Sequence, residues 1–150
     1  MLTREVWFVG PRPEKAHPTD AAYDLVAAIP EVPPLWRKVW QLNPGEWRLI
    51  LTDLKVAIPD GHVGLVCSRS GLALKRGLFV LNAPGVIDPG YRGEIGVILM
   101  NASPRKAVIR PGERVAQLLI IPTSPVRMSE SYRHEAITDR GEGGFGSTGA

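Results

Sequence analysis

Short runs of Val, Ile and Leu recur along the whole chain, separated by Gly, Pro, Asp and Asn. Fourteen prolines and 16 glycines interrupt the sequence so often that no long helical period is present. The apolar runs predict strands at residues 5–9, 24–28, 48–58 (one strand or two), 63–67, 78–81, 95–101, 106–109 and 115–121. Many short strands joined by turns are typical of an all-β sandwich, jelly roll or barrel.

One helix is predicted over residues 70–76, where Ser68 or Ser70 is suited to cap the start and Gly77 to end it. After Pro122 the chain is polar and weakly patterned, with a strand signal only at 126–128. We therefore expect one β-domain over residues 1–122, with an elaborated loop near 31–47, and an extended C-terminal arm over 123–150.

Length, charge and cysteine content are those of a globular protein without disulfides or membrane spans. A chain of 150 residues is long enough to bury a core without disulfides or structural metals. The net charge is +3, but Lys and Arg are scattered among 15 acidic residues, so we expect no nucleic-acid partner. A single cysteine, Cys67, excludes an intrachain disulfide and favours a reducing, cytoplasmic compartment. No uncharged apolar run approaches the ~18 residues of a membrane span, so we expect no membrane association.

The last residues, 140–150, form a chemically distinctive segment. Its five glycines let the backbone approach an anion closely, while Arg140, Ser147 and Thr148 add hydrogen-bond donors. Phe145 is its only large apolar side chain and is able to stack on a flat ring. Taken alone, such a tail is more typical of a disordered terminus. The four clusters that precede it favour a ligand-binding role.

Two of these clusters concern charge. Asp24 enters an apolar strand, where a structural turn role and a role near a metal remain equally open. Arg69, the Ser70 hydroxyl and the free N–H groups at the start of the predicted helix are suited to form an anion site. An ordinary helix cap beside a surface arginine is the alternative interpretation.

The other two clusters concern hydrogen-bonding groups. Residues 82–94 read as a tight β-hairpin whose backbone is able to read the edge of a base, with Asp88 at its mouth as a proton acceptor and Tyr91 as an aromatic wall. A plain hairpin with a turn aspartate is the alternative. Gln117 lies in an apolar strand, where a buried amide is either a core hydrogen-bonder or a ligand contact.

In their order along the chain, these segments resemble the motifs of the homotrimeric dUTPase family (dUTP diphosphatases). The specific phrases are Arg-Ser-Gly-Leu-Ala at 69–73, Gly-Val-Ile-Asp-Pro-Gly-Tyr-Arg-Gly-Glu at 85–94, Arg-Val-Ala-Gln-Leu at 114–118 and Arg-Gly-Glu-Gly-Gly-Phe-Gly-Ser-Thr-Gly at 140–149. The resemblance runs from Ala21 to Gly149 and so covers most of the chain.

The resemblance implies a role for each matching residue. Asp88 would activate the water that attacks the α-phosphorus of dUTP. Tyr91 would pack beneath the deoxyribose and exclude a 2′-hydroxyl, and Asp24 would act near Mg²⁺ through its waters. Uracil would be read by Asn82 and the backbone of Gly85, Val86 and Ile87. The phosphates would be bound by Arg69, Ser70, Gly71 and Gln117.

The resemblance also implies an assembly. In this family the C-terminal arm crosses to a neighbouring subunit, so the active sites lie at the interfaces of a homotrimer. Phe145 would stack on uracil, and the phosphates would be closed over by Arg140, Gly146, Ser147 and Thr148. We therefore expect a jelly-roll (β-clip) homotrimer that hydrolyses dUTP to dUMP and pyrophosphate with Mg²⁺, limiting uracil in DNA and supplying dUMP for dTTP synthesis.

The chain departs from the family pattern in a few places. Ala22 stands where the family usually has Gly, and Ser68 where it often has Pro, both with little expected effect. The stretch 31–47 is longer than expected between the first two motifs and contains Trp36, Trp40 and Trp47. It is either an elaborated loop or a contact surface for a partner or subunit.

Two other functions compete with dUTP hydrolysis. The related dCTP deaminases share the fold but carry a catalytic Glu in the strand after the third motif, where this chain reads Ile-Gly-Val-Ile-Leu at 95–99. A dUTPase-like regulatory protein would instead bind a partner through the Trp-rich stretch. The presence of Asp88, Tyr91 and the complete tail favours intact catalysis.

Overall fold

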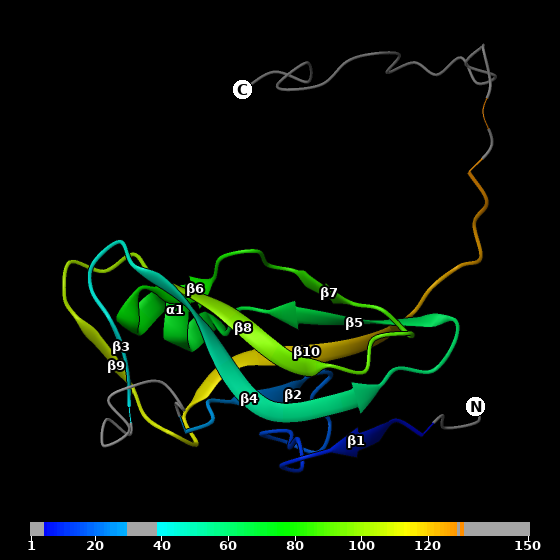
Figure 1. Cartoon of the computed structure of the whole chain (residues 1–150), viewed down its shortest axis with the longest axis horizontal. Coiled ribbons are helices and arrows are strands. Elements are labelled where there is room, and N and C mark those ends of the chain that lie inside the picture. The colour runs from blue at the N-terminus through cyan, green and yellow to red at the C-terminus, as the bar shows by residue number, and fades with distance from the viewer. Residues whose placement is uncertain (1–4, 30–38, 129, 131–150) are drawn as a thin grey trace.

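The computed structural model describes residues 5–29, 39–128 and 130, and its core is built from antiparallel strands (Figure 1). The strands are β1 (Trp7–Val9), β2 (Tyr23–Val26), β3 (Trp40–Leu42), β4 (Trp47–Ala57), β5 (His62–Cys67), β6 (Leu78–Val80), β7 (Gly85–Ile87), β8 (Glu94–Asn101), β9 (Ala107–Ile109) and β10 (Arg114–Pro122). One helix, α1 (Ser70–Arg76), lies between β5 and β6. Among the described residues no helix is long and apolar enough to cross a membrane.

Two four-stranded sheets form the body of the molecule. The first, sheet A, has the order β1-β4-β8-β6, and the second, sheet B, has the order β2-β10-β5-β7. A small third sheet pairs β3 with β9. Alternate residues of the long strands point inward, as in β8, where every second side chain from Ile95 to Asn101 is buried. Buried side chains of all three sheets join into one core, which confirms the predicted all-β fold.

The predicted strands agree with the observed ones to within a few residues, and the run at 48–58 is one strand rather than two. β4 follows β8 in register from Trp47 to Leu51 and again at Lys55, with a bulge between. The residues inside this bulge include Asp53, whose φ of 55° is in the left-handed region. The bulge lets one long strand bend around the core where two strands were also considered.

Helix α1 is correct in its bounds, but its predicted serine cap is wrong. Arg69 occupies the N-cap position, and no side chain caps the helix start. The Ser68 hydroxyl instead accepts a hydrogen bond from the N–H of Val80. Gly77 ends the helix in the left-handed conformation, as predicted, and donates its N–H to the carbonyl of Ala73.

The predicted tight hairpin at 82–94 is also corrected. β7 pairs with β5 in sheet B, whereas the next strand, β8, belongs to sheet A. The segment is therefore a crossover between the two sheets, with a turn in which the N–H of Tyr91 donates to the carbonyl of Asp88. This crossover still presents the backbone of 82–88 at an edge of sheet B.

The tryptophans of the 31–47 stretch have different environments. Trp40 begins β3, a strand that the sequence analysis missed, and is 4% exposed with its Nε1 donating to the carbonyl of Ala28. Trp40 is therefore a core residue and is not available to a partner. Trp47 lies on β4 and is exposed, whereas Trp36 lies outside the described residues.

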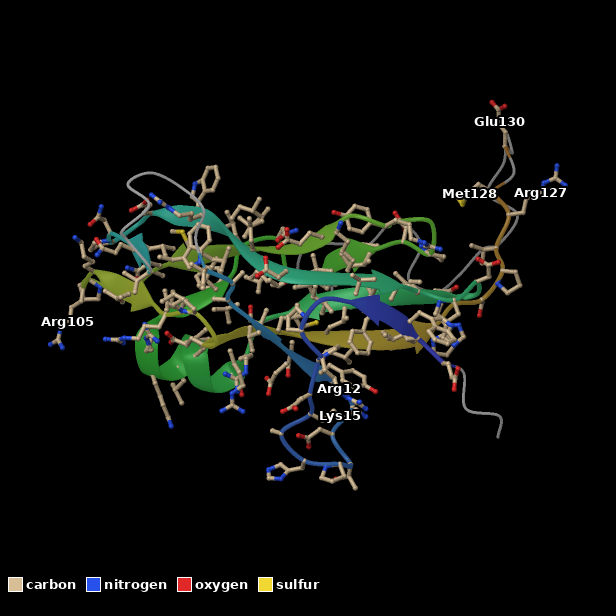
Figure 2. The ribbon with its side chains drawn as sticks, turned by 60° about the horizontal axis from the view of Figure 1, so that its bottom comes forward. Arg12, Lys15, Arg105, Arg127, Met128 and Glu130 are labelled. Carbon is tan, nitrogen blue, oxygen red and sulfur yellow. The ribbon has the colours of Figure 1, made fainter. Side chains whose placement is uncertain are left out.

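The chain after β10 leaves the two sheets. Figure 2 shows Arg127, Met128 and Glu130 on a segment that extends away from the body of the molecule. The weak strand signal at 126–128 was wrong, because these residues belong to no strand, and Val126 and Met128 are exposed. The rest of the predicted arm, residues 131–150, lies outside the described residues.

Candidate functional site

The first group of candidate residues lies where β2, β10 and the start of α1 meet. Cross-strand pairing aligns Asp24 on β2 with Gln117 on β10, and Gln117 in turn with Cys67 at the end of β5. The chain then continues through Ser68 to Arg69, the N-cap of α1. Sheet register thus brings together an acid, an amide and an arginine that are far apart in the sequence.

Asp24 joins two arginines in a closed network. Its Oδ1 forms an ion pair with Arg69 Nε at 2.9 Å, and its Oδ2 accepts a hydrogen bond from Arg114 Nη1 at 3.3 Å. Arg69 Nη1 also donates to the backbone carbonyl of Arg114 at 3.2 Å. The Asp24 side chain is only 14% exposed. These contacts fix the plane of the Arg69 guanidinium and leave its Nη2 without a partner among the described residues.

Beside this network lies an open depression of about 460 Å³, which Asp24, Arg69, Ser70, Gly71 and Gln117 help to line. Gln117 Nε2 donates to the carbonyl of Ser68 at 2.9 Å, so its amide is held at the wall. The N–H groups of Ser70 and Gly71 open α1 and have no partner among the described residues. We call this depression the arginine depression. An arginine fork, a hydroxyl and free N–H groups in one hollow suit an anion.

A second open depression, of about 340 Å³, lies over sheet A where the chain crosses from β7 to β8. It contains the other predicted residues with side-chain chemistry, Asn82, Asp88 and Tyr91, together with Val86 and Ile87. Glu94, Leu49, Leu51, Gly96 and Ile98 complete its lining. We call it the tyrosine depression.

Within the tyrosine depression the Tyr91 side chain is held by a hydrogen bond, whereas the Asp88 side chain is not. The Tyr91 hydroxyl donates to the backbone carbonyl of Glu94 at 2.8 Å, which fixes the ring. Asp88 is exposed, and its carboxylate makes no hydrogen bond or ion pair with the described residues. Gly85 is buried, and a Cβ there would lie 3.3 Å from Asn82 Nδ2. A glycine therefore lets the Asn82 amide approach the backbone closely.

The two depressions lie apart on one chain. Asp24 belongs to β2 and Asp88 follows β7, and these strands are the opposite edges of sheet B. Neighbouring strands are ~4.8 Å apart, so three strand spacings separate the two edges by about 14 Å. The depressions share no lining residue. A single chain thus presents two half-sites.

The face of sheet A that carries the tyrosine depression continues as an apolar surface. Its side chains alternate with buried ones along the strands, and opposite neighbours form apolar pairs such as Leu49 with Ile98. Trp47 is 62% exposed and Leu49 is 50% exposed. The outward row at one end is Trp47, Met100 and Phe79. An apolar sheet face of this kind is typical of a surface that contacts another chain.

Sequence reasoning missed two residues at these half-sites, Arg114 and Glu94. Arg114 completes the Asp24 network, and Glu94 supplies the carbonyl that holds Tyr91. Both residues lie inside motif segments that resemble the dUTPase family, Arg114 in 114–118 and Glu94 in 85–94. That resemblance was the sequence feature by which they could have been found. The predicted residues Arg140, Phe145, Gly146, Ser147 and Thr148 lie outside the described residues.

The described residues contain no group of three or more His, Cys, Asp or Glu side chains that could hold a metal by themselves. Asp24 contacts the arginine of the arginine depression, and each of its oxygens makes one contact. A carboxylate oxygen has two lone-pair sites, so one site on each oxygen is left for a water molecule. This donor set fits an ion that is bound mainly by a ligand and reaches the protein through water.

Comparisons with known proteins show which chains this protein is similar to. A family model described as dUTPase matches residues 10–149. A deoxyuridine 5'-triphosphate nucleotidohydrolase from Methylocella silvestris is 51% identical over 130 residues, which span 87% of this chain and 78% of that protein. A mutant dUTPase of Staphylococcus bacteriophage 80alpha, solved with dUpNHpp, has a TM-score of 0.84 at 30% identity and covers 99% of this chain and 100% of its own.

A second solved structure concerns the metal. A mutant dUTPase from phage phi11 of S. aureus, which coordinates a structural Mg(II) ion, has a TM-score of 0.76 at 27% identity. It covers 89% of this chain and 100% of its own.

Proposed function

The chain belongs to the dUTPase family and is a dUTP diphosphatase, and we propose that it cleaves dUTP by water attack on the α-phosphorus with Asp88 as the general base. The products are dUMP and pyrophosphate. The main observation in support of this mechanism is that the two half-sites contain different chemical groups. One offers anion donors around Arg69, and the other offers an unpaired carboxylate beside an aromatic ring.

The arginine depression suits the triphosphate. Arg69 is held by Asp24 and the carbonyl of Arg114, so a phosphate oxygen meets a pre-oriented fork and needs little rearrangement. Ser70 and the free N–H groups of Ser70 and Gly71 add neutral donors at the same hollow. Negative charge that shifts onto the leaving pyrophosphate is stabilised by these donors.

The tyrosine depression suits the nucleoside. The Tyr91 ring is held by the hydrogen bond of its hydroxyl, so we assign it as the wall that packs against the deoxyribose and excludes a 2′-hydroxyl. Asn82 and the backbone of 85–87 offer paired donors and acceptors for the edge of uracil. Asp88 lies in the same hollow and has free lone pairs for a water proton.

The dUTPase family generally uses Mg²⁺. We assign Asp24 to hold the waters of a Mg²⁺ that arrives with the triphosphate, because its two oxygens each retain an acceptor site. When bound, the ion supplies positive charge to the phosphate oxygens. Mg²⁺ retains waters readily and is commonly bound through substrate phosphates, which fits a site with one carboxylate.

We propose that the complete site forms between copies of this chain in a homotrimer. The half-sites lie at opposite edges of sheet B and share no lining residue, so we assign the two halves of one site to different copies. The apolar face of sheet A borders the tyrosine depression and suits a second copy. The arm after residue 122 then reaches a neighbouring site, where Phe145 stacks on the base and Arg140 contacts the phosphates.

Subunit complementation tests this arrangement. Asp88→Asn and Arg69→Ala should each be nearly inactive, but co-expressed chains should recover activity because some sites combine an intact Arg69 with an intact Asp88. In a cyclic trimer that contains both chains, one of the three sites combines the two intact half-sites, so about a third of wild-type turnover is expected. The measurement is pyrophosphate release by heterotrimers purified through two different tags.

The matched control is co-expression of Asp88→Asn with Asp88→Ala, which should recover nothing because every site lacks the base. Equal inactivity of both mixtures, with heterotrimers present, would contradict a shared site.

A further inference from the structure

Glu94 is the first residue of β8, and its contacts connect two parts of the tyrosine depression. In the proposed mechanism the only role of Glu94 is that its backbone carbonyl accepts the hydrogen bond of the Tyr91 hydroxyl. Its side chain and its backbone bind different elements, and both elements form the wall of the depression.

The side chain of Glu94 holds the bulge of β4. Its Oε1 accepts from the N–H of Thr52 at 2.9 Å and from the N–H of Asp53 at 2.7 Å. Asp53 has a φ of 55°, a conformation that residues other than glycine adopt rarely and only where their surroundings hold them. A carboxylate that accepts two N–H groups is such a constraint. Leu51, directly before this bulge, lines the depression.

The backbone of Glu94 holds the aromatic ring. Its carbonyl accepts from the Tyr91 hydroxyl at 2.8 Å. The ring lies directly against Gly93, where a Cβ would be 2.3 Å from the Tyr91 oxygen. The position of the ring therefore depends on the position of the backbone at 93–94. That backbone is in turn fixed to β4 by the Glu94 side chain.

We infer that Glu94 is a positioning residue that sets the discrimination between deoxyribose and ribose. This inference rests on the proposed function, in which the Tyr91 ring is the wall against the sugar. Exclusion of one oxygen atom requires a wall held to within a fraction of an ångström. A shift of the backbone at 93–94 moves the ring and opens space for a 2′-hydroxyl. Loss of the Glu94 acceptor should therefore change which sugar is accepted more than it changes the chemistry at phosphorus.

The test compares kcat/KM for dUTP and for UTP in the full-length protein. Glu94→Ala should raise the UTP value relative to the dUTP value about tenfold, because it removes the acceptor that holds the bulge. Glu94→Gln keeps a carbonyl oxygen at the same distance along the side chain, so its ratio should stay within about threefold of wild type. Recovery by Gln identifies the acceptor atom as the important feature.

The matched control is Glu46→Ala. Glu46 also accepts a backbone N–H, from Asn43 at 2.8 Å, and that hydrogen bond lowers the pKa of its carboxyl. It lies outside both depressions, so its replacement should leave the ratio unchanged. Thermal unfolding and light scattering on each variant report folding and assembly.

A role of Glu94 in stability alone would lower activity on both substrates equally, since fewer molecules would be folded. An unchanged ratio in Glu94→Ala, with wild type active on dUTP, would therefore overturn the inference and leave the proposed function intact. No dUTP turnover by wild type would instead overturn the proposed function.

Discussion

Asp88→Asn should lower kcat for dUTP by a factor of about 10² to 10⁴, the range that a positioned general base commonly contributes. Asn has the same shape as Asp but cannot take a proton from water. The Asp88 carboxylate makes no hydrogen bond or ion pair with the described residues, so the substitution leaves no buried partner unpaired. Affinity for a non-hydrolysable dUTP analogue should stay within about threefold of wild type. Single-turnover kinetics and calorimetric titration give the two values.

Folding and assembly of Asp88→Asn should match wild type in thermal unfolding and light scattering. Near-normal kcat in this variant would remove Asp88 as the base. Loss of analogue binding to the same extent as loss of turnover would assign Asp88 to binding and not to proton transfer.

Deletion of residues 140–150 should lower kcat/KM for dUTP at least about a hundredfold. It removes a charged fork for the phosphates and a ring whose stacking on a base is worth about 1–3 kcal/mol. The described core should be unaffected, because its buried residues all lie between Leu25 and Leu118. The midpoint of thermal unfolding should therefore shift by less than about 2 °C.

Phe145→Ala in the full-length chain separates stacking from phosphate binding. It should reduce kcat/KM less than the deletion does, since Arg140 and the hydroxyls remain. Full activity of the deleted chain would exclude a role for the tail in closing the site.

The strands were predictable because the local pattern and the burial agree. The apolar runs at 95–101 and 115–121 coincide with β8 and β10, and Gly77 ends the only described helix where its conformational freedom is needed. β3 was missed because its three residues, Trp40 to Leu42, lie in a Trp- and Pro-rich stretch with no visible period. Its pairing with β9 is a long-range contact that no local pattern encodes.

The site was less predictable than the fold. The sequence offered Asp24, Arg69 and Gln117 as separate candidates, and only the sheet register brings them together. The predicted hairpin at 82–94 was wrong because the turn residues there indicate only a local reversal of the chain. The observed pairing of β7 with β5 depends on where the two sheets pack. Arg114 and Glu94 lie inside the motif segments at 114–118 and 85–94, but no local pattern indicates what their side chains contact. Their roles appear only in the contacts with Asp24 and the β4 bulge.

The protein should hydrolyse dUTP with selection of both base and sugar. Pyrophosphate release measured side by side with dUTP, dCTP, dTTP and UTP in the presence of Mg²⁺ tests it most directly. We expect rapid release from dUTP and release from the other three that is slower by at least about a hundredfold, because each differs in the base edge or the 2′ position. No release from any of the four would contradict dUTP hydrolysis, and equal release from dUTP and UTP would contradict the sugar wall at Tyr91.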